Sequence, residues 1–439
     1  MKLGRKLNWT TLWVYVLAIL FAGRLHAQDI TGNWQGTITP PQGKPLRIVL
    51  RVTRDDSGAL KALIYSIDQG PQGDRADSIT MQDSTVKFVV GMIQLSYEGK
   101  LSADGNSITG TWTQGSQFPF NFQKATKATA WPIDASPHTM QFVTVEPGVK
   151  LEVLDWGGTG RPLVFLAALG DTAHAFDKFA PRFVGKYHVY GITRRGFGDS
   201  SYPALNDHNY SSDRLGDDVL AVIEALQLQK PVLAGHSIAG EELSSIGSRH
   251  PEKVSGLIYL DAGYPYALYD RAHGDTQLDM LDTRNKIEQL LPFDPSGQKQ
   301  PIEALLDTLP RLEKDLQNEL KRLQAVPPPT TNSPQPPPAS AFFTIFNGEQ
   351  KYAEIKAPCL AIFAVPHDSN AILPTDPAHR AAAVAFELER STNMANSFAT
   401  GVPSAQVVRL PNANHYVFNS NEAEVLRAMN DFLDKLPQP

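Results

Sequence analysis

The first part of the chain alternates apolar and polar positions in short runs, a pattern typical of half-buried strands. Leu46–Val52 and Val86–Val90 are two such runs, and turn-forming segments such as Asp56–Gly58 and Ala103–Asn106 separate the runs from one another. Regular short strands divided by turns predict an all-β domain, either a small barrel or a sandwich, over residues 28–127.

After residue 140 the pattern changes to apolar strands that alternate with amphipathic helices. Leu215, Val219 and Leu226 recur at helical spacing between two of these strands. This rhythm predicts the α/β class: a mostly parallel sheet of eight strands over 141–439, preceded by a linker at 128–140. The strands are expected at 141–145, 151–154, 163–167, 187–192, 232–234, 254–260, 359–364 and 407–410.

The alternation of strands and helices is interrupted between Asp261 and Cys359. Helical patterns occupy much of this interval, and a proline-rich stretch follows them at 327–338. A structureless loop of that length is uncommon inside a domain. The sequence therefore predicts a helical cap inserted at about 263–356, with an extended, polyproline-like strap.

The composition and the chain ends limit the classes of function. The net charge of -6 excludes the basic surface that nucleic-acid binding requires. Positive residues at the N-terminus precede an apolar run at 9–22, which predicts a signal peptide over 1–27 and export to the periplasm or the medium. An uncleaved N-terminal anchor is the alternative, and no membrane span is expected after cleavage. The single cysteine, Cys359, excludes an intramolecular disulfide.

The segment Gly235-His-Ser-Ile-Ala239 has the form of a nucleophile elbow, G-x-S-x-G with alanine in the last place. Small residues around Ser237 allow a sharp strand-to-helix turn that lifts its hydroxyl above the sheet. Because a serine hydroxyl is a poor nucleophile, a base must remove its proton. His415 follows the last predicted strand and precedes the final helix, so it is expected at the same edge of the sheet and suits that role.

Four local patterns together resemble the α/β-hydrolase fold serine hydrolases over about 141–435. The elbow is one of them, and the others are Ala167–Gly170, Arg195–Ser200 (the R-G-x-G-x-S turn) and Asn412–Tyr416. At the N-terminus, Gly32-x-Trp34 resembles the opening of lipocalin-like barrels, which implies a ligand-carrying barrel or a packed accessory module.

The hydrolase resemblance implies a catalytic triad in the order serine, acid, histidine. It favours Asp368, just beyond the strand that the family usually uses, with Asp261 as the runner-up acid and Asp376 third. It also implies an oxyanion hole from the backbone N–H groups of Leu169 and Ile238. Ala168 stands where the family often has glycine, which leaves the geometry of that hole in question.

These residues predict an exported serine hydrolase that cleaves a small or medium carboxylic ester through an acyl-enzyme. The same triad leaves open an aminopeptidase resembling the proline iminopeptidases, or a C–C bond hydrolase. A non-catalytic exported binding protein, acting through its β domain, is the third alternative. No metal-ligand spacing, Walker loop or dinucleotide motif stands in a suitable context, so neither a metal nor another cofactor is expected. His174 and His367 are each expected either at the pocket mouth or on the surface.

Overall fold

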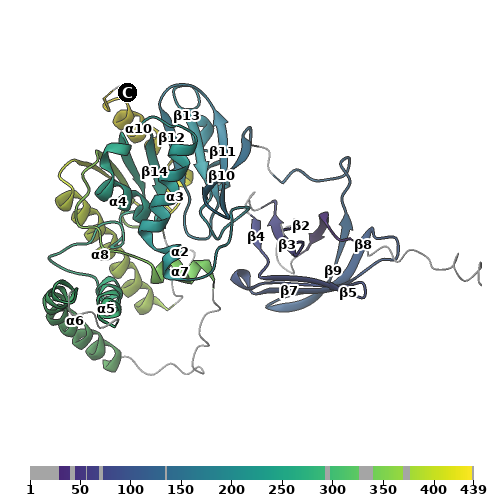
Figure 1. Cartoon of the computed structure of the whole chain (residues 1–439), viewed down its shortest axis with the longest axis horizontal. Coiled ribbons are helices and arrows are strands. Elements are labelled where there is room, and N and C mark those ends of the chain that lie inside the picture. The colour runs from purple at the N-terminus through teal and green to yellow at the C-terminus, as the bar shows by residue number, and fades with distance from the viewer. Residues whose placement is uncertain are drawn as a thin grey trace, which may run out of the picture. The chain divides into compact units, whose positions relative to one another are not determined.

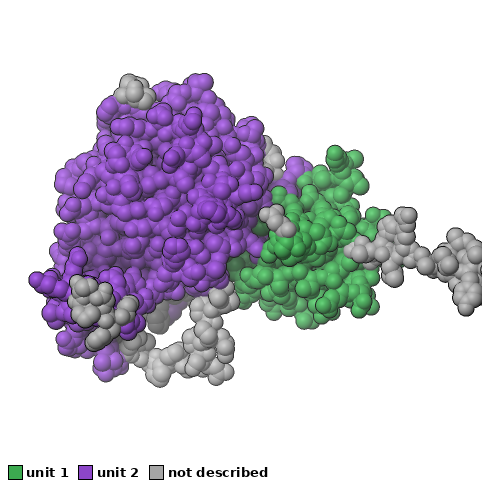
Figure 2. Space-filling model, viewed as in Figure 1, with its two compact units in different colours: residues 1–64, 76–131 green, residues 65–75, 132–439 purple. Residues whose placement is uncertain are grey.

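The computed structural model describes residues 29–39, 45–55, 57–68, 73–133, 136–291, 297–325, 340–368 and 376–437. The predicted signal peptide and the proline-rich strap lie outside these residues. The chain divides into two compact units, one of residues 1–64 and 76–131 and one of residues 65–75 and 132–439 (Figure 2). Each unit is described by itself.

The N-terminal sheet is antiparallel and has nine strands, in the order β4-β3-β2-β1-β9-β8-β7-β6-β5 (Figure 1). Edge strands β4 and β5 are separated in the chain by Ala76 and Asp77 alone, so the sheet must curl to bring its edges together. Trp34, Phe88 and Phe122 fill its interior and are almost fully buried. The predicted all-β domain is therefore confirmed as a half-barrel. Its strands are β1 (Gly32–Ile38), β2 (Leu46–Arg54), β3 (Leu60–Ser66), β4 (Gly73–Arg75), β5 (Ser78–Gln82), β6 (Thr85–Val90), β7 (Leu95–Leu101), β8 (Ser107–Gln114) and β9 (Ser116–Lys124), with the 3-10 turn η1 (Gly91–Ile93) before β7.

The second sheet has eight strands in the order β10-β11-β13-β12-β14-β15-β16-β17. At one edge, β11 pairs antiparallel with both β10 and β13. All the remaining pairs, from β13–β12 to β16–β17, are parallel. The predicted α/β class and the eight strands are confirmed. The strands are β10 (Thr139–Glu146), β11 (Val149–Gly157), β12 (Pro162–Leu166), β13 (His188–Ile192), β14 (Val232–His236), β15 (Gly256–Leu260), β16 (Cys359–Ala364) and β17 (Ala405–Leu410).

Helices cover both faces of this sheet because its strands are apolar on both sides. In β12, Val164 belongs to one core cluster and Phe165 to the other, as the two-residue period of a strand requires. The first cluster includes residues of α3 (Ser212–Ala225), α4 (Gly240–Arg249) and α8 (Pro377–Gly401). The second includes residues of η2 (Ala173–Phe176), η3 (Ala180–Phe183), α9 (Val417–Ser420) and α10 (Glu422–Leu433).

The interval between β15 and β16 contains the helices that the sequence predicts as a cap. They are α5 (Thr276–Leu290), α6 (Lys299–Ala325) and α7 (Ala341–Asn347). The short helix α2 (Asp207–Tyr210) contacts α7, and the turns η4 (Ser237–Ala239) and η5 (Pro251–Lys253) flank α4. Within the described ranges, no helix combines the length and apolar character needed to cross a membrane.

Candidate active site

Ser237 lies in a tight turn between β14 and α4, where its backbone is left-handed with φ of 56°. Only small neighbours permit this turn: a Cβ on Gly240 would lie 2.1 Å from the backbone oxygen of Ala262, and one on Gly235 would lie 3.0 Å from Ala239. A non-glycine residue held at positive φ costs free energy and is a recurring feature of functional sites. This geometry has the form of the predicted nucleophile elbow.

A buried carboxylate holds the His415 ring. The Nδ1–H of His415 donates to Oδ2 of Asp261 at 2.6 Å, and the Asp261 side chain is fully buried. Asp261 follows β15, and its Oδ1 accepts from the backbone N–H of Ala364 at 3.0 Å. The carboxylate is thereby fixed in position, and it leaves Nε2 as the nitrogen of His415 that can accept a proton.

A second histidine reaches the same carboxylate oxygen. The His367 Nε2 lies 2.5 Å from Asp261 Oδ2, and its Nδ1 pairs with Glu387 of α8. Burial alone would lower the pKa of His367, but its hydrogen bonds to Asp261 and Glu387 outweigh burial and raise that pKa. Burial likewise opposes ionisation of Asp261, yet the hydrogen bonds from His367 and His415 lower its pKa to about 2. Asp261 is therefore an anion at neutral pH.

His236, next to the elbow serine, supports the backbone of His415. Its Nε2–H donates to the His415 carbonyl at 3.0 Å, and the two ring centroids are 4.6 Å apart. Burial, followed by the nearby His415, lowers the pKa of His236 to about 3, so His236 is neutral at pH 7. This contact brings the loop after β17 to the end of β14, and His415 therefore lies at the same edge of the sheet as Ser237.

Two tyrosines from the start of the insertion complete this side of the site. The Tyr266 hydroxyl lies close enough to the Ser237 side chain to interact with it. The ring of Tyr264 lies 5.5 Å from that of Tyr266 and 6.2 Å from that of His415, measured between centroids. The Ser237 side chain and the His415 ring thus lie beside the same pair of tyrosines.

A buried arginine holds the loop after β12 through hydrogen bonds to its backbone. Arg194 donates to the carbonyl oxygens of Ala167 at 3.0 Å and Ala168 at 3.3 Å, and it pairs with both carboxylate oxygens of Glu242 at 2.7 Å. The residue of this loop with positive φ is Gly170, at 88°, whereas Ala168 keeps an ordinary negative φ. Alanine at position 168 therefore imposes no backbone strain.

The two predicted oxyanion donors lie on this loop and on the elbow. The Leu169 side chain packs against the apolar cluster that contains Ile238. Among the hydrogen bonds of the described residues, none uses the Leu169 N–H as donor. The role of these two N–H groups as an oxyanion hole stays a prediction.

The remaining candidate acids lie elsewhere. Asp368 follows β16, its side chain is exposed, and its backbone N–H donates to the Ala413 carbonyl at 2.8 Å. Asp376 is also exposed, just before α8. The carboxylate that the structure brings to His415 is that of Asp261, the runner-up, because Asp261 is buried at the end of the strand adjacent to β14.

Comparison with known proteins gives this arrangement a family. A model described as the alpha/beta hydrolase family matches residues 163–428. The chain belongs to the alpha/beta hydrolase family. It is 33% identical over 139 residues to the AB hydrolase superfamily protein YisY of Bacillus subtilis (strain 168), covering 29% of this chain and 50% of that protein.

Two further similarities are more distant. The chain is 28% identical over 119 residues to a 2-hydroxymuconate semialdehyde hydrolase of Pseudomonas sp. (strain CF600), covering 26% of this chain and 41% of that one. A solved epoxide hydrolase from Bacillus megaterium is 19% identical and covers 67% of this chain and 100% of its own, with a TM-score of 0.42. The chain thus spans half or less of the length of the two curated relatives, the YisY protein and the semialdehyde hydrolase.

Three residues of this alpha/beta hydrolase site carry roles that the sequence analysis did not assign. They are Tyr266, which interacts with the Ser237 side chain, and the pair His367 and Glu387 beside Asp261. The sequence offers a weak signal for His367 alone, because it lies just beyond an apolar strand whose carboxyl end is at the same edge of the sheet as Ser237. Glu387 lies on α8, for which the sequence analysis names no helix.

Proposed function

We propose that this alpha/beta hydrolase is a serine hydrolase that cleaves small or medium carboxylic esters through an acyl-enzyme. The observation that carries the proposal is the 2.6 Å hydrogen bond from His415 to the buried Asp261, beside the elbow of Ser237. In this proposal the triad is Ser237, His415 and Asp261, and Asp261 takes the place of Asp368 as the acid.

The first half of the reaction forms the acyl-enzyme. As Ser237 Oγ attacks the ester carbonyl carbon, His415 Nε2 takes the hydroxyl proton, and Asp261 stabilises the imidazolium that forms. The carbonyl oxygen becomes an oxyanion, which accepts hydrogen bonds from the N–H groups of Leu169 and Ile238. When the tetrahedral intermediate collapses, the C–O bond to the alcohol breaks and His415 returns its proton to that leaving alkoxide.

The second half hydrolyses the acyl-enzyme. Water attacks the acyl carbon while His415 removes its proton, the Ser237–acyl bond breaks, and the proton passes back to Ser237. The same oxyanion donors serve both steps, since the charge develops on the same oxygen. One imidazole thus acts alternately as base and acid.

The surroundings of the oxyanion donors support an apolar acyl group. Ile238 and Leu169 pack with residues of α7 in one apolar cluster, which includes Ala341, Ile345 and Phe346. Ligand sites are lined mainly by apolar and aromatic side chains with a few polar groups. A short acyl chain that packs against this apolar cluster would be removed from water when its carbonyl carbon is next to Ser237.

The similarity to a 2-hydroxymuconate semialdehyde hydrolase supports a C–C bond hydrolase as the second candidate, with the same triad. The aminopeptidase alternative needs carboxylates that enclose a substrate amine. Of the four acids on α6 that could supply them, Glu303, Asp307 and Glu313 are exposed, and Asp315 is half-buried. Export, and a binding role for the β domain, remain proposals that rest on the N-terminal sequence and on the Gly32-x-Trp34 pattern.

Labelling and turnover test the proposal. The wild-type chain is expected to react with a fluorophosphonate probe and to hydrolyse p-nitrophenyl acetate and butyrate, and Ser237→Ala is expected to lose both activities. Ser248→Ala is the matched control on the far end of α4, where its hydroxyl donates only to a carbonyl at 2.6 Å. Labelling retained by Ser237→Ala would refute Ser237 as the nucleophile. A panel that adds aminoacyl and β-diketone substrates separates ester from peptide and C–C chemistry.

A further inference from the structure

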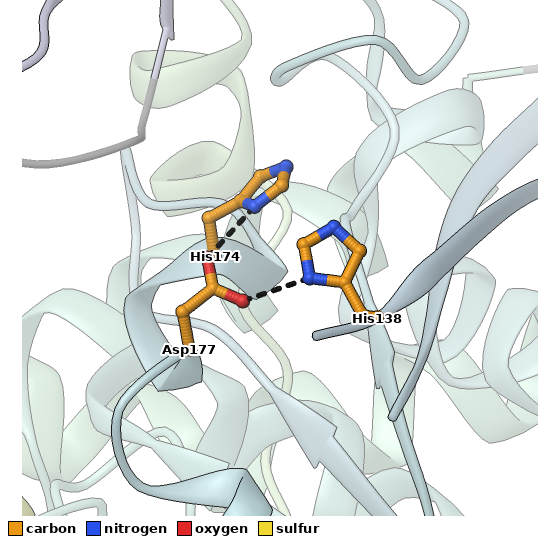
Figure 3. A group of neighbouring side chains, drawn as sticks. All are labelled: His138, His174 and Asp177. Carbon is orange, nitrogen blue, oxygen red and sulfur yellow. Dashed lines mark hydrogen bonds and ion pairs between the residues drawn. The ribbon is translucent and has the colours of Figure 1, made fainter. Parts of the chain in front are cut away.

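Two histidines converge on one carboxylate well away in the chain from the triad residues. The Nδ1 atoms of His138 and His174 lie 3.1 and 2.9 Å from the two oxygens of Asp177 (Figure 3). His138 directly precedes β10, His174 lies in η2, and Asp177 follows η2. All three side chains are largely buried, with 10%, 16% and 8% of their surface exposed.

We propose that His138, His174 and Asp177 form a binding site for a divalent transition metal ion, with zinc as the ion that their chemistry fits. Two imidazole nitrogens and one carboxylate oxygen are a ligand set that zinc accepts, with water in the fourth position. The possible ligand atoms lie within 4.8 Å of one another. In a tetrahedral site with bonds of about 2.0–2.1 Å, neighbouring ligand atoms are about 3.3 Å apart. The separations of the two imidazole nitrogens from the Asp177 oxygens, 3.1 and 2.9 Å, are already close to that value, and at most about 1.5 Å has to be closed between any other pair of ligand atoms.

Glu152 of β11 supplies an independent reason for this assignment. Its Oε1 lies 3.5 Å from Nε2 of His174, the ring nitrogen that faces away from Asp177. Histidines that bind metals almost always have their other ring N–H directed at a carboxylate, carbonyl or water, which fixes the tautomer and leaves the remaining nitrogen for the ion. A buried carboxylate on that side of His174 is the arrangement that metal binding through Nδ1 requires.

Further contacts hold the ligands in place. The hydroxyl of Ser136 donates to the Asp177 carbonyl at 3.2 Å and accepts from Trp156 Nε1 at 2.9 Å. The edge of the Trp156 ring also meets that of His138, with centroids 5.8 Å apart. These contacts preorganise the cluster, and less ordering free energy is therefore lost when an ion binds.

An ion at this site would tie the segment that enters β10 to the turn η2. Because η2 begins only a few residues after Leu169, the same ion would also restrain the loop that carries one oxyanion donor. The role inferred is structural: the ion would stabilise the fold and would not take part in hydrolysis. The linear pattern of the sequence does not reveal the site, because His138 is distant in the chain from the other two ligands.

The test is metal binding by the full chain, measured without reference to its activity. After the protein is stripped with a chelator, zinc is titrated in competition with a chromophoric chelator, and cobalt is added separately as a spectroscopic probe of coordination. Wild type is expected to bind one zinc ion and to give the visible absorption of four-coordinate cobalt. Zinc at about 100 times its Kd should raise Tm by roughly 5 °C.

The variants separate this site from other histidines. His138→Gln and His174→Gln are each expected to weaken zinc binding by at least about 100-fold, since ligand loss exceeds the 10–100-fold effect of outer partners. His188→Gln is the matched control, because the His188 ring pairs with Asp155 at 2.9 Å and stacks on Tyr190, away from the proposed ligands, and its loss should leave binding unchanged. His367→Gln checks the cluster around Asp261, whose possible ligand atoms are as close together.

Three results would overturn the proposal. The first is a wild-type chain that binds no zinc below about 100 µM, which would mean that the two imidazoles only donate hydrogen bonds to Asp177. The second is binding that survives in both His138→Gln and His174→Gln. The third is binding that is lost in His367→Gln alone, which would assign the ion to the cluster around Asp261. The wild-type titration stands even if a variant fails to fold.

Discussion

Replacing Asp261 with asparagine removes one charge at the centre of the proposed triad and little else. The amide keeps a carbonyl oxygen, so the hydrogen bond from the Ala364 N–H can persist, and the side-chain volume is nearly unchanged. What is lost is the negative charge to which both His415 and His367 are hydrogen-bonded. Asp261→Asn therefore tests whether that charge supports catalysis.

The size of the effect follows from the burial of the carboxylate. Two unit charges about 4 Å apart, at an effective dielectric constant of about 20, attract by about 4 kcal/mol. This attraction exists only while His415 is an imidazolium, as it is when Ser237 attacks, and 4 kcal/mol is about a thousandfold in rate. Loss of the correct imidazole tautomer adds to it, so kcat is expected to fall by about 10³ to 10⁴.

The assay is p-nitrophenyl butyrate hydrolysis by the full chain at pH 7.5, with fluorophosphonate labelling rates as a second readout. Asp368→Asn is the matched control, since it makes the same chemical change at the exposed acid after the neighbouring strand. We expect Asp368→Asn to stay within about threefold of wild type. Circular dichroism and Tm establish that both variants are folded.

The reasoning fails if folded Asp261→Asn keeps more than about a tenth of wild-type kcat. It fails differently if Asp368→Asn is the variant that loses activity. In that case the acid is the one that the family resemblance favours, and the hydrogen bond from His415 to Asp261 is structural.

Three further predictions concern the surroundings of the triad. Arg194→Lys keeps the positive charge beside Glu242 but loses the bidentate pairing and the hydrogen bonds to the loop after β12, which carries Leu169. We expect kcat to fall about tenfold with KM little changed. An unaltered kcat would contradict a positioning role for Arg194. His367→Phe removes one donor from Asp261, and kcat/KM should fall about tenfold while Tm drops; a loss of Tm without any loss of kcat/KM would make His367 structural only. Burial, and then the charge of Asp275, raises the pKa of Glu349 to about 8, so its contribution to stability is complete below pH 4.5 and is lost as the pH rises through 8. The decline of Tm from pH 5 to 9 should accordingly be shallower in Glu349→Gln than in wild type, and parallel curves would show that Glu349 does not ionise on its own in this range.

The local features of the nucleophile could be predicted from the sequence because steric exclusion is a local matter. Gly235 and Gly240 leave no room for side chains, as a sharp strand-to-helix turn around Ser237 requires. The strands were predictable for a related reason, since strands buried on both faces are continuous apolar runs. Their carboxyl ends then identify the edge at which His415 must lie.

The choice between Asp261 and Asp368 could not be made from the sequence. Both follow strands that are neighbours in the sheet, so both satisfy the same pattern. The structure distinguishes them by burial and by backbone conformation: Asp261 has φ of 49° and a fully buried side chain, whereas Asp368 is exposed. A side chain's direction depends on that local conformation and on packing with distant residues, and neither is encoded in spacing.

What the sequence by itself determined is the α/β class, the elbow at Ser237 and the position of His415, each of which depends on a short stretch of chain. What only the tertiary structure decided is which groups meet: Asp261 with His367, and His138 with Asp177. The physical reason is that a hydrogen bond or a metal site requires atoms within about 3 Å, and folding brings them there from segments whose separation in the chain is arbitrary.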